Sequence, residues 1–416
     1  MIKRFEFNEA IVSAGLFGFL VMTTVSGLVT TYSSQDAVYF IRLIAAAIVS
    51  IATAFSVGRL RLSRSVVISL VLYLFVFLYV VAVASITGGF NIVVQSLALD
   101  FFVSLCGIVL FGTKFHESTR VFPSVFLRLF TFYAIGAILL TFVLGGFVFA
   151  LPPRFVFDVF SDQIGREENY SLMMTSFFML AAIFSSIGFV RSGLRIYKMI
   201  YFVFLLLFLL LSVLGGGRGE LVAGLLIIAL VLFRQRKVRF VSIAAFGALV
   251  VGGLIFSSMN VFEDVVAVQR FYLLFEGDLS ARDSLFGQVL DLLASQPSCI
   301  LFGCGPGFFQ RYYGYDFGYY PHNSIAEASV IYGLPLLIVG LVFAANGLVK
   351  YYKKVGRVDL FLVYFLYSCL ISLKSGYLFG SWPVVAGVFF FIGIGFERAQ
   401  YYNSSGLRLP VKKLGI

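Results

Sequence analysis

Charged side chains are scarce in this chain: they make up 12% of its 416 residues, about half the share found in soluble domains. Hydrophobic residues make up 60%, and the mean hydropathy is +1.00. This composition excludes an ordinary soluble protein. Strand-rich segments are absent as well. In a lipid bilayer, the backbone of such a chain can form its hydrogen bonds only within its own helices. The sequence therefore predicts an all-α membrane protein.

Groups of metal-binding side chains are also missing. The chain has two histidines and four cysteines, and no histidine or acidic cluster accompanies Cys299 and Cys304, so neither a metal centre nor a cofactor is expected. Cys106 and Cys369 lie in apolar stretches and are interpreted as small core residues. Cys299 and Cys304 fall in a loop predicted to face outward, where thiols can oxidise. Two separate thiols are the preferred interpretation there, and a disulfide is the alternative.

Long apolar stretches take up most of the chain. A spanning helix needs roughly 20 apolar residues, and about twelve such helices are predicted, which makes the protein polytopic. Their ranges are 10–30, 37–57, 66–86, 92–111, 125–148, 172–190, 199–214, 216–233, 240–256, 324–345, 359–373 and 382–396.

The basic residues between these stretches predict an orientation. Of 31 Lys and Arg residues, 23 fall at the termini and on alternate connections, which the positive-inside rule assigns to the cytoplasm. Both termini are therefore predicted to be cytoplasmic. The net charge of +11 is therefore explained by the membrane topology and by contact with anionic lipid headgroups. No nucleic-acid partner is expected. The eight remaining basic residues are Arg42, Arg154, Arg166, Arg218, Arg270, Arg282, Arg311 and Lys374.

Three regions are expected. Residues 1–256 hold nine spanning helices, 257–322 form a large outward loop, and 323–416 hold three more helices and a cytoplasmic tail. Within the loop, Ser280 to Asp283 has the form of a capping box, and apolar residues then recur at the spacing of an amphipathic helix on the outer face. These apolar residues are Leu285, Phe286, Val289, Leu290 and Leu293.

Tyrosines gather where the loop returns to the membrane. An aromatic belt at the membrane interface is the preferred interpretation, and stacking on sugar rings is the alternative. The residues are Tyr312, Tyr313, Tyr315, Tyr319 and Tyr320.

A glycine-rich turn precedes the eighth stretch and is the first candidate site. Gly217 and Gly219 flank Arg218, and Glu220 follows. Glycines allow backbone amides to approach a ligand, and amides at a helix start favour an anion. The Arg218 guanidinium adds a permanent cation suited to phosphate or pyrophosphate. The alternative is a turn in which Arg218 only pairs with Glu220.

The outward loop carries three further candidate cations, Arg270, Arg282 and Arg311. Each could be a solvated charge paired with a nearby acid. Arg282, at the start of the amphipathic helix, is the first choice for a functional role.

The third candidate lies where the loop meets the tenth stretch. His322 can accept a proton from a hydroxyl near neutral pH, and Asn323 could orient the substrate or the ring. Glu327 lies one helical turn further on, entering the predicted span, where carboxylates are costly and usually functional. The alternative is that His322 only bonds a loop carbonyl. The other histidine, His116, lies in a predicted cytoplasmic loop.

Two further patterns are interpreted as structural. The glycines of the segment 303–307 are expected to shape a turn, because the strand that would precede a dinucleotide-binding loop is missing. Arg42 and Asp100, at similar predicted depth, are expected to form an ion pair within the bundle, and a proton or ion pathway is the alternative.

Together these residues resemble the O-antigen polymerase and ligase superfamily of bacterial membrane enzymes. Gly217-Arg218-Gly219 is similar to the family's Arg-Gly turn, and Arg282 with the segment 301–307 is similar to the middle of its periplasmic loop. His322-Asn323, separated by nine residues from Gly333, is similar to its His-Asn signature. The ligase form has a second glycine where this chain has Leu336. The resemblance covers the topology of the whole chain, while the specific motifs lie between residues 215 and 333.

The resemblance implies a GT-C-like, metal-independent glycosyltransferase of the bacterial inner membrane, with its active site at the periplasmic face. Arg218 and Arg282 would hold the pyrophosphate of a polyprenyl-pyrophosphate-linked oligosaccharide, and His322 would activate the acceptor hydroxyl. Substrate contacts are expected from Gly217, Gly219, Glu220, Arg270, Arg311, Asn323 and Glu327.

A polymerase that transfers the growing glycan onto the next lipid-linked repeat unit is the preferred interpretation, with a chain-length regulator and a flippase as partners. A ligase that transfers the glycan to lipid A core is the first alternative. A transporter or flippase is the second, and a non-catalytic scaffold is the third. Carboxylate pairs are scarce in the outward loops, which argues against a hydrolase that uses two acids.

Overall fold

The computed structural model describes the greater part of the chain. The ranges are 2–29, 35–59, 62–92, 98–117, 124–143, 147–148, 154–155, 172–214, 218–234, 282–315, 320–355, 359–375, 378 and 380–396. Several predicted features lie outside these residues. They are the ninth apolar stretch, Gly217, Arg270, Tyr319 and the Ser280 side of the capping box.

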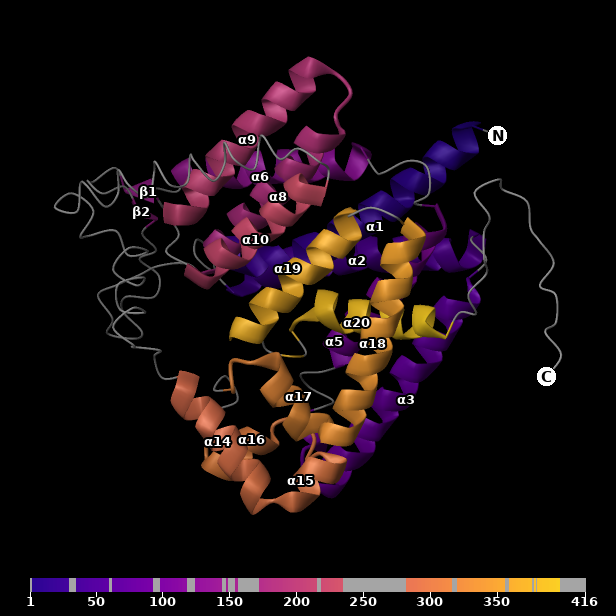
Figure 1. The fold of residues 1–416 in the computed structure, drawn as a ribbon, viewed down its shortest axis with the longest axis vertical. Coiled ribbons are helices and arrows are strands. Elements are labelled where there is room, and N and C mark those ends of the chain that lie inside the picture. The colour runs from indigo at the N-terminus through magenta and orange to yellow at the C-terminus, as the bar shows by residue number, and fades with distance from the viewer. Residues whose placement is uncertain are drawn as a thin grey trace.

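The described chain is helical except for one antiparallel pair of two-residue strands (Figure 1), β1 Phe147–Val148 and β2 Arg154–Phe155. The helices are α1 Ile2–Val29, α2 Gln35–Arg59, α3 Arg64–Ile86, α4 Phe90–Ile92, α5 Ala98–Glu117, α6 Ser124–Val143, α8 Leu172–Arg191, α9 Arg195–Leu214, α10 Arg218–Arg234, α14 Arg282–Ser295, α15 Pro297–Phe302, α16 Phe308–Tyr313, α17 Ser324–Tyr332, α18 Leu334–Val355, α19 Leu360–Ser375 and α20 Trp382–Gly395.

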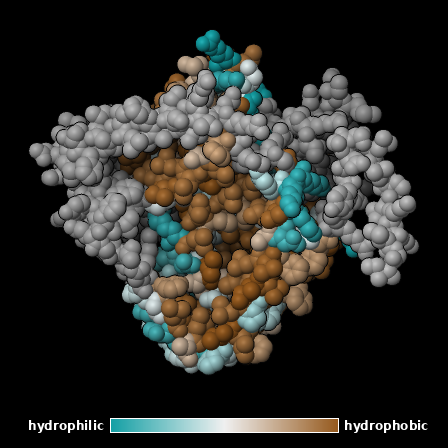
Figure 2. All heavy atoms as spheres, viewed as in Figure 1, coloured by the Kyte–Doolittle hydropathy of each residue, from teal (hydrophilic) through white to brown (hydrophobic). Residues whose placement is uncertain are grey.

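Four of the described helices are long and apolar enough to cross a membrane, namely the segments Phe40–Gly58, Arg64–Ile86, Arg195–Val213 and Leu334–Val355. Many of their large apolar side chains are exposed: Phe75 of α3 and Leu43 of α2 are each 68% exposed. Soluble proteins rarely expose apolar surface of this extent. Figure 2 shows an apolar surface across the middle of one face, with hydrophilic residues in small patches around it. The protein is therefore an all-α protein with the surface of a membrane protein.

The helix α20 lies at the centre of one half of the bundle, in contact with α3, α5, α18 and α19. Small residues allow the closest of these approaches. A side chain at Gly347 of α18 would place its Cβ 1.7 Å from the carbonyl oxygen of Phe391 in α20. The other half is built around α8, which packs on α9, α10, α1 and α6.

A separate group of short helices, α14 to α17, gathers at one end of the bundle (Figure 1). We call residues 282–315 and 320–332 the loop subdomain. It has its own apolar core. It also contacts α3, where the Tyr79 hydroxyl donates a hydrogen bond to the Phe302 carbonyl. The core residues are Leu285, Val289, Leu292, Leu293, Cys299, Cys304, Phe309, Ala326 and Val330.

The predicted amphipathic helix is confirmed as α14, although its buried face is shifted. Leu285, Val289 and Leu293 are buried as expected, whereas Phe286 is 47% exposed and Leu290 is 53% exposed. The difference arises because α14 packs on α17 and α15, and Leu292 points into that contact in place of the two exposed residues.

The bounds of the tenth predicted span, 324–345, were wrong. The chain breaks at Gly333, which has φ 79° and ψ 155°, a conformation open essentially to glycine alone. The residues before it form the short helix α17 of the loop subdomain, and the helix long enough to span is α18, Leu334–Val355. Glu327 therefore lies in the loop subdomain, before the spanning helix begins.

The glycines of the segment 303–307 shape a turn, as predicted: Gly303, Gly305 and Gly307 all have positive φ. The turn lies along the end of α17, because the Cys304 amide donates a hydrogen bond to the Val330 carbonyl at 2.7 Å. A Cβ at Gly333 would lie 2.8 Å from the Gly303 nitrogen. Gly303 and Gly333 thus face each other in a contact that has no room for a side chain.

Replacing Gly333 by alanine is expected to destabilise the fold by about 1–3 kcal/mol from backbone strain alone, because alanine adopts this φ and ψ poorly. Gly340 of α18 is the matched control, since nothing lies within 4 Å of a Cβ built there and alanine is the better helix former. The measurement is the thermal unfolding temperature in detergent. Equal unfolding temperatures for Gly333→Ala and Gly340→Ala would contradict the expectation.

The two cysteines of the loop subdomain form a disulfide, Cys299–Cys304. The preference for two separate thiols was wrong. The reason is local: α15 ends at Gly303, and the turn that follows brings the two cysteines to a Cα–Cα distance of 5.0 Å, within the range that a disulfide requires. The remaining cysteines, Cys106 and Cys369, are free.

Candidate functional site

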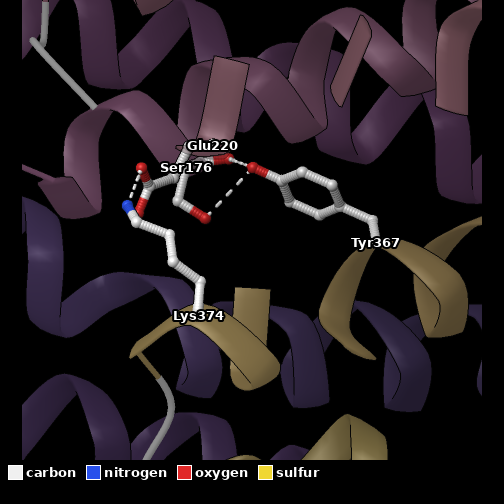
Figure 3. A network of polar contacts seen from close by, with 4 residues as sticks. All are labelled: Ser176, Glu220, Tyr367 and Lys374. Atoms are coloured by element: carbon white, nitrogen blue, oxygen red, sulfur yellow. Dashed lines mark hydrogen bonds and ion pairs between the residues drawn. The ribbon is translucent and has the colours of Figure 1, made fainter. Parts of the chain in front are cut away.

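A buried ion pair joins the start of α10 to the end of α19 (Figure 3). The Nζ of Lys374 donates a hydrogen bond to Oε2 of Glu220 at 2.5 Å. Glu220 is 2% exposed and the Lys374 side chain is 22% exposed. Glu220 was expected to pair with Arg218 if the turn were only structural, and its partner in the fold is Lys374.

Gly219 gives the lysine room to reach this position. A Cβ at Gly219 would lie 2.3 Å from Cδ of Lys374 and 2.7 Å from its Cε. The methylene stem of the lysine therefore lies directly against the backbone of the first turn of α10. This explains one glycine of the Arg-Gly turn by packing, and it places the ammonium group beside the residues that follow Arg218.

A second contact anchors α8 to α19 next to the ion pair. The Tyr367 hydroxyl lies 3.3 Å from the Ser176 Oγ and donates to the Ser176 carbonyl at 3.2 Å (Figure 3). The three helices α8, α10 and α19 are thus held together by polar contacts close to the ion pair.

The same end of α19 also holds the segment that carries His322. The Ser324 Oγ donates to the Ser372 carbonyl at 3.1 Å and contacts the Ser372 Oγ. Ser372 precedes Lys374 by two residues, and His322 precedes Ser324 by two. The last turn of α19 is therefore in contact with the start of α10 on one side and with the start of α17 on the other.

His322 has an unusual backbone. Its φ is 54°, in a region that few non-glycine residues occupy, and its ring lies 4.2 Å from the ring of Tyr320, centroid to centroid. Strained residues of this kind gather at functional sites, so the conformation supports a role for His322 beyond packing. The next residue, Asn323, caps α17: its Oδ1 accepts hydrogen bonds from the amides of Ile325 and Ala326 at 3.0 and 3.1 Å.

Glu327 is buried one turn into α17. Its Oε2 accepts a hydrogen bond from the amide of Leu378 at 2.7 Å, just beyond the end of α19. Burial raises the pKa of the Glu327 carboxyl from its ordinary 4.5 to about 8, and the Leu378 hydrogen bond opposes this shift. The neutral acid is therefore the form that the fold favours.

This shift predicts that stability falls with pH. Because the pKa is higher in the folded protein, the contribution of Glu327 is complete below the unfolded pKa of 4.5 and is lost as pH rises through about 8. The unfolding temperature of the wild type is expected to fall more steeply between about pH 5 and pH 9 than that of Glu327→Gln. The amide of glutamine keeps an acceptor for Leu378 without a titrating proton. Identical slopes in the two proteins would contradict this assignment.

The remaining predicted residues are placed only in part. Arg218 is the first residue of α10 and Arg282 the first residue of α14, and their side chains lie outside the described residues. Gly217 and Arg270 lie outside them altogether. Their proximity to His322 stays a prediction, although α14 packs against α17, the helix that directly follows His322.

Arg311 makes contacts within the fold. Its Nη2 donates to the Thr87 carbonyl at 3.2 Å, and its guanidinium lies 6.0 Å from the centre of the Phe308 ring. It connects α16 to the end of α3, and a substrate contact for Arg311 stays a prediction.

The tyrosines of the loop subdomain that follow Arg311 also make internal contacts. The Tyr313 hydroxyl donates to the Gln288 carbonyl at 2.8 Å, and the Tyr315 hydroxyl accepts from Nε2 of Gln288 at 2.9 Å. These bonds fix the chain after α16 to α14. Neither the belt nor the sugar-stacking interpretation accounts for them.

Asp100 is hydrogen-bonded within the bundle. Its Oδ1 accepts from Nε1 of Trp382 at 2.7 Å, and Arg42 interacts with it electrostatically. The expected ion pair of Arg42 and Asp100 stays a prediction, and Trp382, at the start of α20, is a partner of Asp100 that the sequence did not indicate. Among the described residues, no three histidine, cysteine or acidic side chains lie together as a metal site would require.

Lys374 is the residue of the site that sequence reasoning missed. It was noted only as one of eight basic residues on the predicted outward side. Lys374 follows an apolar stretch on the predicted outward side, against the positive-inside trend, and this position is the signal that could have singled it out.

Comparison with family models, with curated proteins and with solved structures found no match to this chain.

Proposed function

We propose that this protein is a membrane glycosyltransferase that polymerises lipid-linked repeat units of a bacterial surface polysaccharide. The donor is a polyprenyl-pyrophosphate-linked glycan and the acceptor is the next lipid-linked repeat unit. The proposal includes about twelve spanning helices, a GT-C-like arrangement, a periplasmic site and cytoplasmic termini. The observation that carries it is the last turn of α19, which contacts both the start of α10, where Arg218 lies, and the segment of His322.

The proposed reaction is a single displacement. The acceptor hydroxyl oxygen attacks the anomeric carbon of the donor sugar, and its proton passes to His322. The bond from this carbon to the pyrophosphate oxygen breaks, and the electron pair leaves with the pyrophosphate. Arg218 and Arg282 stabilise the charge that develops on this leaving group, so that no metal is needed. Attack opposite the leaving group inverts the anomeric configuration.

Three features support the outward placement of this site. The loop subdomain contains a disulfide, which persists in oxidising compartments such as the periplasm. The basic residues favour the opposite side of the membrane. Glu220 and Lys374 also lie at helix ends, in the first turn of α10 and in the last turn of α19, whereas a transporter tends to place its charges near the middle of the membrane.

Deletion of the gene tests the proposal and separates it from the ligase alternative. Loss of a polymerase is expected to leave lipopolysaccharide core that carries one repeat unit. Loss of a ligase would leave bare core while lipid-linked polymer accumulates. The measurement is the electrophoretic ladder of surface glycan together with the pool of lipid-linked intermediates. A surface glycan unchanged by the deletion would contradict both assignments.

A further inference from the structure

We propose that Lys374 is a positioning residue of this site, which holds the Arg218–Gly219 turn of α10 beside the segment that carries His322. The inference rests on the proposed function, because it assigns Arg218 and His322 to one reaction. We infer that the last turn of α19 connects α10 to α17, two helices that lie far apart in the sequence.

Lys374 contacts α10 in two ways. Its ammonium is paired with the buried carboxylate of Glu220 at 2.5 Å. Its stem occupies the space that a side chain at Gly219 would need, with Cδ 2.3 Å from the position of that Cβ. An ionic contact and a packing contact on successive residues fix both the distance and the rotation of the first turn of α10 relative to α19.

The opposite side of the same turn of α19 fixes α17. Ser372 accepts a hydrogen bond from Ser324 through its carbonyl at 3.1 Å and donates one to Ser381 at 2.9 Å. Displacement of α19 by loss of Lys374 would therefore change the position of Arg218 relative to His322, even though Lys374 itself contacts neither reacting group in this proposal.

The energetics of an ion pair with a buried carboxylate favour a positioning role for Lys374 over simple stabilisation of the fold. Removing two charges from water costs about as much as their attraction returns, and a well-packed apolar pair of similar volume often stabilises a fold as well or better. What an ion pair adds is one defined geometry.

The test compares Lys374→Met, Glu220→Gln and the double variant with the wild type. Methionine and glutamine keep the volume of the side chains and remove their charge. Lys374→Met is expected to lower the unfolding temperature by about 5 °C, because it leaves the buried Glu220 carboxylate unpaired. Glu220→Gln is expected to lower it less, because the Lys374 side chain is 22% exposed and its ammonium can be hydrated. The double variant is expected to recover most of that loss, since neither charge remains. Lys350→Met is the matched control: Lys350 of α18 donates a hydrogen bond to the Gly395 carbonyl, away from α10.

The transfer activity of the variants distinguishes a positioning role of Lys374 from a role in stability alone. With a synthetic polyprenyl-pyrophosphate repeat unit as substrate, the kcat of Lys374→Met is expected to fall about a hundredfold, with KM nearly unchanged, since a displacement of about 1 Å has this effect. The double variant is expected to stay equally slow although its stability has recovered, whereas Lys350→Met keeps its kcat.

Each contrary result has a distinct meaning. Recovery of kcat together with stability in the double variant would reduce the pair to a structural contact and overturn the inference. A raised KM with unchanged kcat in Lys374→Met would mean that the lysine binds the substrate directly, and would overturn it too. Additive losses of stability in the double variant would show that the pair is not coupled, and would overturn the inference alone. A wild type that transfers no glycan would overturn the proposed function, and the positioning role with it.

Discussion

Replacement of Arg218 by alanine is expected to abolish polymer without loss of the protein from the membrane. Arg218 begins α10, and the free amides at the start of a helix already favour an anion. In the proposed reaction the pyrophosphate leaves with its charge increasing, and removal of one fixed cation or donor from such a leaving group slows a reaction by about 10² to 10³. The rate should therefore fall below what a polysaccharide ladder can reveal.

Arg234 is the matched control for Arg218, because it is the last residue of the same helix and lies at the predicted cytoplasmic end. Arg234→Ala should leave the ladder intact. Arg282→Ala, at the start of α14, is expected to abolish polymer in the same way as Arg218→Ala. The measurements are the glycan ladder and the amount of protein in the membrane fraction. Wild-type chain lengths in Arg218→Ala or Arg282→Ala would remove that residue from the mechanism.

Replacement of His322 by alanine is expected to have a comparable effect through the other reactant. If the imidazole accepts the proton of the acceptor hydroxyl, its loss should slow transfer by about 10² to 10⁴, while the donor still binds. Single-turnover measurements on purified protein should therefore show a normal affinity for the lipid-linked donor and a slow chemical step.

The sequence contains only one other histidine, so His116→Ala is the natural control and should retain full activity. His322→Gly addresses the backbone, because glycine adopts the φ of 54° without strain. If His322→Gly were active, the conformation of the turn would matter and the imidazole would not. If His322→Ala were active, the assignment of His322 as the base would fail.

The helical architecture was readable from the sequence because it depends on local apolar composition. Lipid forces each long apolar stretch into a helix, so most predicted stretches coincide with described helices. The helix α14 begins at Arg282, within the predicted capping box. The division of the predicted tenth span at Gly333 was not readable in this way. Apolar residues continue on both sides of that glycine, and only its contact with Gly303 shows why the helix must stop there.

The candidate site was predictable in its types of residue and unpredictable in its contacts. The Arg-Gly turn and the His-Asn pair carry recognisable chemistry. Lys374 and Glu220, in contrast, are 154 residues apart, and the spacing of residues in a single sequence carries no information about which helices are neighbours. The disulfide was misjudged for a related reason, since the turn that brings the two cysteines together depends on the packing of residues 303–305 along α17.

The central claim is that this chain alone joins lipid-linked glycans at an outward-facing site, and one measurement addresses it directly. Purified protein in vesicles is given synthetic polyprenyl-pyrophosphate oligosaccharides with a chelator present and no ion gradient, and product lengths are read by mass spectrometry. The account predicts products longer by whole repeat units, with inverted anomeric configuration at each new linkage. Oligosaccharides that are recovered at their starting length, or that are only moved across the bilayer, would contradict it.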